Sequence, residues 1–315
     1  MSTLSAVLET FASHLSQVGF ELLGVAIALH FANLLLRATA WRAILAAAVP
    51  SHRVPWRGVT GAYLAGAGMN CILPARGGDV VKVVLANRAV PGASCPVVAA
   101  GLLVETLLDV VVGGALVTWA VWSGAVPARL LDVRPPGGSG VVLVIAATLI
   151  GAAVIAAGRA RGPAARLLHK LRQGVSILES PRRYLRVVVL PQSLGWLCRV
   201  GSMYCFLHAF HVGGGLNHAA LALVAGSVTS VLPLTPGGVG TQQALLLVLL
   251  AGVATPSTVL SFSVGTQLVM TSVNVLVGGV CVGLLLRTMP WRVRLTMPMD
   301  TEPVPIPLPV STSGE

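Results

Sequence analysis

STVLSFSVGTQLVMTSVNVLVGGVCVGLLL is the sequence of residues Ser257–Leu286, thirty positions without one charged side chain. An α-helix needs about 20 apolar residues to cross the hydrocarbon core of a bilayer. A second stretch, Val141–Ala157, also lacks charge and is just long enough for the same role. These stretches predict a membrane protein built from helices.

The composition of the whole chain agrees with a membrane setting. Hydrophobic residues make up 55% of the 315 residues and charged residues only 10%, whereas a soluble domain has about 25% charged residues. The formal net charge of +11 could suggest a nucleic-acid-binding protein. We exclude nucleic acid as a partner because the basic residues lie in loops between apolar stretches, as they do in membrane proteins.

The apolar stretches fall into two kinds, continuous and interrupted. Five continuous segments are predicted to be full spans: Val18–Leu36, Val97–Trp122, Val141–Ala157, Val187–His211 and Ser257–Leu286. Two further regions, Gly58–Ala86 and His218–Leu250, are apolar at both ends but contain clustered Pro and Gly in the middle. Pro and Gly at this density end a helix. Each limb is about 14–16 residues, or about 21–24 Å at 1.5 Å per residue, which is shorter than the roughly 30 Å core. We therefore expect two re-entrant helix hairpins.

Basic loops predict the orientation of the chain. The loop Arg159–Arg186 holds eight Arg and Lys residues, and the stretch Arg37–Arg57 holds four with no acid. Both are expected on the cytoplasmic side. We therefore predict a multi-pass protein of the cell membrane with its N-terminus outside and its C-terminus in the cytoplasm.

The two interrupted regions resemble each other. When Pro74 is aligned with Pro233, small residues precede both prolines and a Gly-Gly pair follows both. The two units are predicted to have opposite orientations, and inverted repeats around broken helices are typical of transporters. The expected organisation is an N-terminal segment, a single transmembrane domain, and a disordered Pro-rich tail. The boundaries are 1–17 for the segment, 18–290 for the domain and 291–315 for the tail, with inverted halves at about 18–122 and 187–286, linked by the span 141–157 and the basic loop 159–186.

The motifs carry a family resemblance. They are Asn70–Asp79 (NCILPARGGD), then Glu105 and Asp109, then Pro233–Gly240 (PLTPGGVG). This combination resembles the flippase-like membrane domain of lysylphosphatidylglycerol synthases, a family with stand-alone relatives found with glycosyltransferases or linked to hopanoid transport. The resemblance covers about residues 15–290 and implies a role in moving lipids.

Two departures limit what the resemblance implies. Relatives often have an acid shortly after the second Gly-rich turn, where this chain has Gln242 and Gln243, so a proton- or cation-coupled role for that position is in doubt. No soluble aminoacyl-transferase domain accompanies the membrane domain, so synthase activity is not expected.

Ionisable residues deep in a membrane are costly, so they are candidate functional residues. Glu105 and Asp109 are four residues apart and share one helix face, and Arg199 lies at a similar depth in another span. One interpretation is a structural cluster in which Arg199 neutralises one of the acids. The other is a polar cavity in which the same groups meet a lipid head group or a proton.

Residues at the two breaks could bind a head group. Arg76 and Asp79 lie where a new helix begins, and free N–H groups with a guanidinium suit a phosphate. Asn70, Thr235 and Gln242 could offer neutral hydrogen bonds or could join helices to one another. For Lys82 and Arg88, lying at the membrane surface with the charge in water is the favoured interpretation.

The sequence contains no cofactor motif, so we expect no cofactor, and the scattered His residues are not expected to bind a metal. The leading hypothesis is a transporter that moves a polar or anionic lipid, or a lipid-linked precursor, between leaflets. A membrane-embedded transferase acting on a lipid phosphate and an accessory subunit of a glycosyltransferase are the alternatives. The expected partners are membrane lipids, with an anionic head group favoured.

Overall fold

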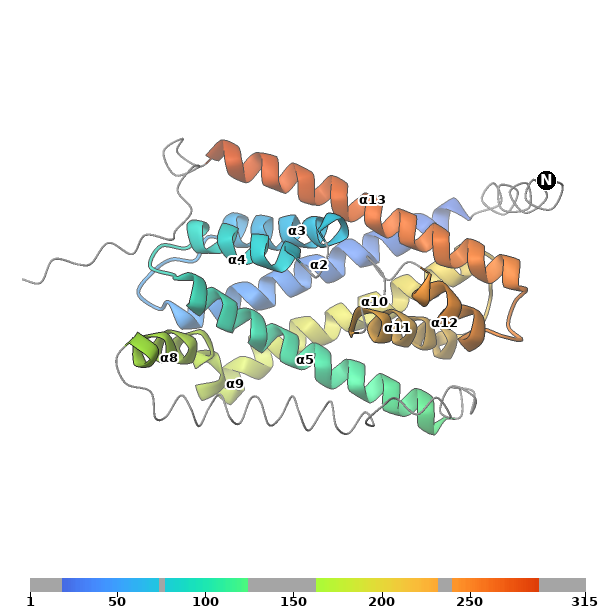
Figure 1. Cartoon of the computed structure of the whole chain (residues 1–315), viewed down its shortest axis with the longest axis horizontal. Coiled ribbons are helices and arrows are strands. Elements are labelled where there is room, and N and C mark those ends of the chain that lie inside the picture. The colour runs from blue at the N-terminus through green and yellow to red at the C-terminus, as the bar shows by residue number, and fades with distance from the viewer. Residues whose placement is uncertain (1–18, 74–76, 124–162, 232–239, 289–315) are drawn as a thin grey trace, which may run out of the picture.

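The computed structural model describes residues 19–73, 77–123, 163–231 and 240–288 (Figure 1). Within these ranges all regular secondary structure is helical. The bridge between Ala251 and Ala254 is isolated and forms no strand. The all-α class predicted from the apolar stretches is therefore confirmed.

The helices have the following bounds in chain order: α2 Phe20–Ala48, α3 Trp56–Ile72, α4 Gly77–Ala89, α5 Cys95–Trp122, α8 Pro163–Gly174, the 3₁₀ turn η2 Ser176–Glu179, α9 Pro181–Tyr184, the π-helical turn η3 Leu185–Val189, α10 Leu190–Ala209, α11 Leu216–Val231, α12 Thr241–Leu249 and α13 Pro256–Thr288. Because α9, η3 and α10 follow one another without a break, they form one continuous helix from Pro181 to Ala209.

Proline and glycine punctuate these helices. Proline occupies the first turn of α5 and α9, where its missing N–H is not needed by the helix. Gly92, in the turn between α4 and α5, has a φ of +73°, a conformation that side chains with a Cβ rarely adopt.

Among the described residues, three helices are long and apolar enough to cross a membrane, namely α2, α5 and α13 (to Leu285). Their outward faces carry large apolar side chains such as Leu103, Leu107, Leu268 and Leu276, which are 48–69% exposed. Such faces suit lipid tails rather than water. These features identify an integral membrane protein, whereas the predicted span 141–157 lies outside the described residues.

The first helix is longer than the sequence predicted. We expected the first span to end at Leu36, with Arg37 opening a cytoplasmic loop, but α2 continues to Ala48. Trp41, Ile44 and Leu45 in the added part are completely buried. Arg37 therefore lies inside a helix, and assigning it to a loop was wrong.

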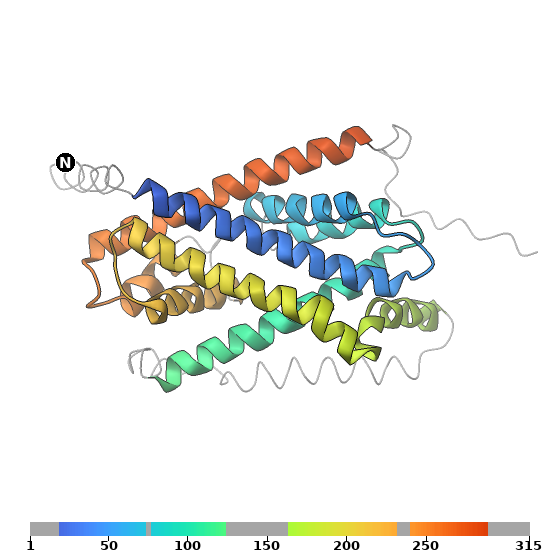
Figure 2. The ribbon, with the colours of Figure 1, turned by 180° about the vertical axis from the view of Figure 1, so that it is seen from behind.

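Helices α2 and α10 lie side by side through the middle of the molecule, with α3 and α13 packed on one side (Figures 1 and 2). The α3–α13 crossing is close because it is made by glycines. A Cβ added to Gly68 would lie 2.5 Å from the carbonyl oxygen of Asn274, and one added to Gly278 would lie 2.7 Å from the Gly68 Cα. Small residues at such crossings let backbones approach in membrane proteins.

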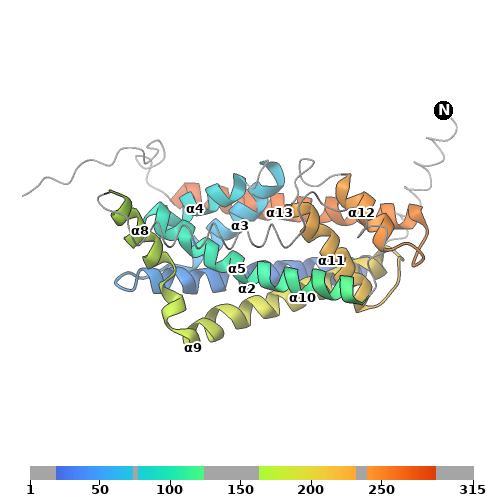
Figure 3. The same ribbon diagram turned by 60° about the horizontal axis from the view of Figure 1, so that its bottom comes forward.

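Two helix pairs enter the molecule from opposite ends. Helix α3 starts at the end where α2 finishes and runs towards the middle, and α4 packs against it and returns. Helices α11 and α12 contact each other at the other end (Figures 1 and 3). The break between α11 and α12, and the turn residues 74–76, lie outside the described residues.

Basic residues gather at the end of the molecule where α2 finishes and α3 starts. It contains the end of α2, the start of α3, the ends of α4 and α13, and helices α8 and α9 (Figures 1 and 3). The last turns of α4, α8 and α13 carry Arg88, Arg172 and Arg287, and α9 carries Arg182 and Arg183. We call this the basic end. Its charge agrees with the loop pattern from which the orientation was predicted.

Candidate functional site

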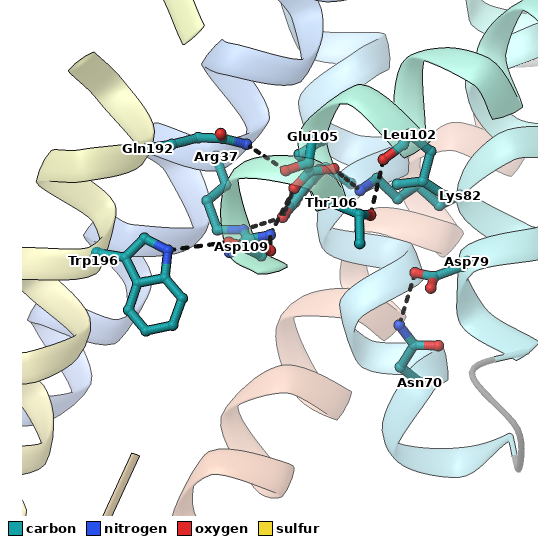
Figure 4. A network of polar contacts seen from close by, with 11 residues as sticks. Arg37, Asn70, Asp79, Lys82, Leu102, Glu105, Thr106, Asp109, Gln192 and Trp196 are labelled. Carbon is teal, nitrogen blue, oxygen red and sulfur yellow. Dashed lines mark hydrogen bonds and ion pairs between the residues drawn. The ribbon is translucent and has the colours of Figure 1, made fainter. Parts of the chain in front are cut away.

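A buried carboxylate, Glu105, lies at the centre of a charged network among α2, α3, α4 and α5 (Figure 4). Glu105 is 1% exposed. Its Oε1 accepts hydrogen bonds from Arg37 Nη2 at 2.9 Å and from the Tyr63 hydroxyl at 2.7 Å. Its Oε2 accepts from Lys82 Nζ at 2.8 Å. One carboxylate thus binds three donors from three different helices.

Arg37 joins this carboxylate to a second one. Its Nη1 donates to Asp109 Oδ1 at 2.8 Å, its Nη2 contacts Asp109 Oδ2, and its Nε donates to the Tyr63 hydroxyl at 2.7 Å. The two contacts with Asp109 form the forked pairing that a guanidinium makes with a carboxylate. A lysine could not reproduce all of these contacts, because its ammonium is a single point of charge.

Lys82 is enclosed by aromatic rings as well as by Glu105. Its Nζ lies 3.8 Å from the centre of the Tyr63 ring and 4.5 Å from that of Trp41, distances typical of cation–π contacts. The residue is 4% exposed. The prediction that Lys82 lies at the membrane surface was therefore wrong.

Helix α10 completes the network from the other side. Gln192 Nε2 donates to the backbone carbonyl of Glu105 at 3.3 Å, and Trp196 Nε1 donates to Asp109 Oδ1 at 3.1 Å. The Arg199 guanidinium stacks on the Trp196 ring, 4.8 Å from its centre.

Arg199 does not take the role that we predicted for it. Among the described residues, no ion pair joins Arg199 to Glu105 or Asp109, and Arg37 and Lys82 make those contacts instead. The predicted pairing was wrong because the position of a residue along its predicted span does not tell which way its side chain points around the helix. Arg199 contacts the network through the Trp196 ring.

The four charges of the network balance one another. Arg37 and Lys82 contribute +2, and Glu105 and Asp109 contribute −2. Glu105 lies about 15 Å and Asp109 about 21 Å from the start of α5, a helix about 42 Å long at 1.5 Å per residue. The acids are therefore near the middle of a candidate span, where unpaired charges would be costly. Balanced pairing is what lets the charges remain there.

A small polar pocket of about 100 Å³, partly open to the outside, borders this network. Its wall includes Arg37, Lys82, Glu105 and Asp109 from the network. The side chain of Asp109 is 24% exposed, whereas that of Glu105 is 2% exposed. Asp109 is thus the more accessible of the two acids.

Asn70 and Asp79 extend the pocket to the hairpin formed by α3 and α4. Asn70 Nδ2 donates to Asp79 Oδ1 at 3.1 Å across the two helices. The buried Asn70 Oδ1 has no hydrogen-bond partner among the described residues. The helices can approach closely here because Gly78 has no Cβ. A Cβ at that position would lie 2.2 Å from the Gly66 carbonyl oxygen.

The structure gathers some of the predicted site residues but not all of them. Asn70, Asp79, Glu105 and Asp109 border one pocket. Gln242 is separate, with its Nε2 beside Gly226 of α11. Arg76 and Thr235, which the sequence also singled out, lie outside the described residues.

The sequence did not predict the network roles of Arg37, Tyr63, Lys82, Gln192 and Trp196. One signal could have found Arg37, because the buried residues Trp41, Ile44 and Leu45 follow it at helical spacing. That pattern indicates a helix that continues past the arginine.

Together the fold and the network define an all-helical integral membrane protein with a charged pocket among its helices. A family model described as the lysylphosphatidylglycerol synthase TM region matches residues 3–278. The chain belongs to this family, which confirms the resemblance seen in the motifs and connects the chain with membrane lipids. Comparisons with curated proteins and with solved structures gave no significant match.

Proposed function

We propose that this protein moves a polar or anionic lipid, or a lipid-linked precursor, between the two leaflets of the cell membrane. The observation that carries the proposal is the pocket beside Arg37, Lys82 and Asp109, which places paired charges and a partly exposed carboxylate near the middle of a candidate span. A charged head group needs such a polar environment, because crossing bare hydrocarbon is costly.

The arrangement of the helix pairs supports a transporter. The pairs α3–α4 and α11–α12 come from opposite ends of the molecule, as two re-entrant hairpins of an inverted repeat would. In our proposal the basic end faces the cytoplasm, with the N-terminus outside and the C-terminus inside. The inverted halves are those expected from the sequence, about 18–122 and 187–286.

In this proposal, the network can bind and release a head group without leaving a buried charge unpaired. A phosphate entering the pocket would compete with the carboxylate of Asp109 for the Arg37 guanidinium, since both are forked acceptors. Release of the lipid would restore the Arg37–Asp109 pair.

The contacts argue against the transferase alternative, in which Glu105 or Asp109 is a general base. Glu105 already accepts from Arg37, Tyr63 and Lys82, and Asp109 accepts from Arg37 and Trp196. Both oxygens of Glu105 are thus occupied by donors from the protein, two of them cations. Asp109 is more accessible, but using it as a base would break its forked pair with Arg37.

The test uses purified protein reconstituted into liposomes that contain a fluorescent phosphatidylglycerol. A membrane-impermeant quencher measures lipid movement, and mass spectrometry measures whether the lipid has changed. Faster movement of lipid with unchanged mass supports transport. A changed mass would replace the proposal with the transferase, and absence of both movement and change would favour the accessory subunit.

Variants at matched protein density connect the activity with the pocket. Arg37→Lys keeps the positive charge but loses the fork, and we expect it to slow lipid movement at least tenfold. Ser202→Ala is the control, because Ser202 is a buried polar residue that donates to the Ala26 carbonyl at 2.8 Å outside the pocket. If both variants move lipid as fast as the unsubstituted protein, the pocket is not the path.

A further inference from the structure

A second group of charges lies at the basic end, away from the pocket. Arg182 and Arg183 of α9 and Arg186 of η3 border a shallow, open hollow together with Val187, and the wall of this hollow is mostly apolar. All three arginines are exposed. Three exposed arginines within five residues concentrate positive charge and hydrogen-bond donors, which suits a phosphate.

These arginines have no acidic partner within the part of the chain that the structure describes. The nearest acid in sequence is Glu179 of η2, whose ion pair is with Arg172 of α8 at 3.9 Å. In the buried network, by contrast, each cation is matched by a carboxylate. The hollow is therefore a place where an external anion would complete the charge balance.

The helix that follows the arginines exposes apolar side chains. Along the same continuous helix, Leu190, Leu194 and Leu197 are 56%, 43% and 68% exposed, and spacings of four and three residues place them on one helix face. From Arg186 to Leu197 the helix rises about 16 Å, close to half of the roughly 30 Å hydrocarbon core. The arrangement provides a charged end for a head group and an apolar stripe for one acyl chain.

We propose that Arg182, Arg183 and Arg186 form a binding site for the phosphate of an anionic phospholipid whose acyl chain lies along the exposed leucines of α10. This site differs from the polar pocket, shares no residue with it and does not depend on the transport proposal. Positive charge combined with an apolar stripe matches a membrane phospholipid better than a soluble phosphate compound, which would leave the stripe unused.

The π-helical turn explains how the chain can present this site. A π-helical turn contains one residue more than an α-helical turn and changes the direction of the side chains that follow, and such turns are frequent at functional sites. Here the turn separates the arginines of α9 from α10, whose Gln192 and Trp196 contact the buried network. A lipid held at the arginines would also hold the start of that helix.

Native mass spectrometry of the detergent-purified full-length protein tests the site. The protein is incubated with phosphatidylglycerol or, separately, with phosphatidylcholine, and the retained lipid is counted. The test variant is the triple substitution Arg182→Gln, Arg183→Gln and Arg186→Gln. At about fivefold per arginine near a membrane surface, we expect the three substitutions together to lower phosphatidylglycerol binding by about one hundredfold.

A matched control removes the same amount of charge from the same region. The triple substitution Arg53→Gln, Arg57→Gln and Lys170→Gln changes three exposed basic residues that do not line the hollow. The proposal predicts nearly unchanged binding in this control and weaker retention of phosphatidylcholine by the unsubstituted protein. Equal losses in the two triple variants would show that overall charge, rather than a site, binds the lipid, and would overturn the proposal.

A competition experiment distinguishes binding of a lipid from binding of free phosphate. Inorganic phosphate at millimolar concentration should displace little phosphatidylglycerol, because it cannot use the leucine stripe. Complete displacement at that concentration would overturn the assignment to a lipid. Leu190→Ser with Leu194→Ser should weaken phosphatidylglycerol binding several-fold without a change in the arginines, and unchanged binding would contradict the proposed place of the acyl chain.

Discussion

Substituting Glu105 by glutamine replaces one oxygen of a buried carboxylate with an NH₂ group. The two oxygens of Glu105 accept from Arg37, Tyr63 and Lys82 at 2.7–2.9 Å. The remaining amide oxygen can still accept from Arg37 and Tyr63, but the new NH₂ group cannot accept from Lys82. The Lys82 ammonium is then left buried without its acceptor.

The expected loss of stability follows from this stranded charge. Removing one partner of a buried ion pair costs about 3–5 kcal/mol, whereas interhelical hydrogen bonds in a membrane protein average only about 0.6 kcal/mol. Because two of the three contacts survive, we expect about 3 kcal/mol for Glu105→Gln, at the low end of the ion-pair range. Lys82→Met, which leaves Glu105 paired with Arg37, should cost about 2 kcal/mol.

A double-mutant cycle isolates the interaction between the two residues. In a protein that already carries Lys82→Met, the substitution Glu105→Gln strands no ammonium, so its cost should fall to about 1 kcal/mol. The double variant would then lose about 3 kcal/mol instead of the sum of about 5, a coupling of about 2 kcal/mol.

The measurement is the free energy of unfolding in mixed micelles of dodecylmaltoside and dodecyl sulfate, followed by helical circular dichroism. Ser202→Ala serves as a control for a buried polar residue outside the network. Additive losses for Glu105→Gln and Lys82→Met, to within about 0.5 kcal/mol, would show that the two side chains do not interact and would refute this account of the network.

Three further predictions concern packing, topology and the first break. Gly68→Ala should destabilise the protein by about 1–3 kcal/mol because the new Cβ would lie 2.5 Å from the α13 backbone, while Gly114→Ala, with nothing within 4 Å, should be tolerated in the same unfolding assay. Cysteines placed at the exposed Ser123 and Ser180 on a background without native cysteines should be labelled from opposite sides of intact cells, and labelling from one side would contradict the proposed topology. Arg76→Lys should slow lipid movement in liposomes, and Arg76→Ala should slow it more, if the guanidinium contacts a head group; unchanged rates would remove this residue from the mechanism.

The sequence alone determined the class of this protein and part of its site. Charge-free stretches such as Ser257–Leu286 require helices in a membrane, because backbone polar groups must be satisfied within the chain when no water is present. The positions of Glu105 and Asp109 in an apolar stretch indicated a functional or structural cluster, because isolated charges there are costly. Both inferences depend on local composition, which is read directly from the chain.

Only the tertiary structure decided which cations meet these acids. Spacing along a helix shows which residues share a face, but the rotation of one helix against another depends on packing across the whole bundle. Arg199 has a suitable depth yet stacks on Trp196, whereas Arg37, which follows an apolar stretch, turns inwards to Asp109. The long-range packing that buries α2 through to Ala48 brings Arg37 into the network, and no local pattern contains that contact.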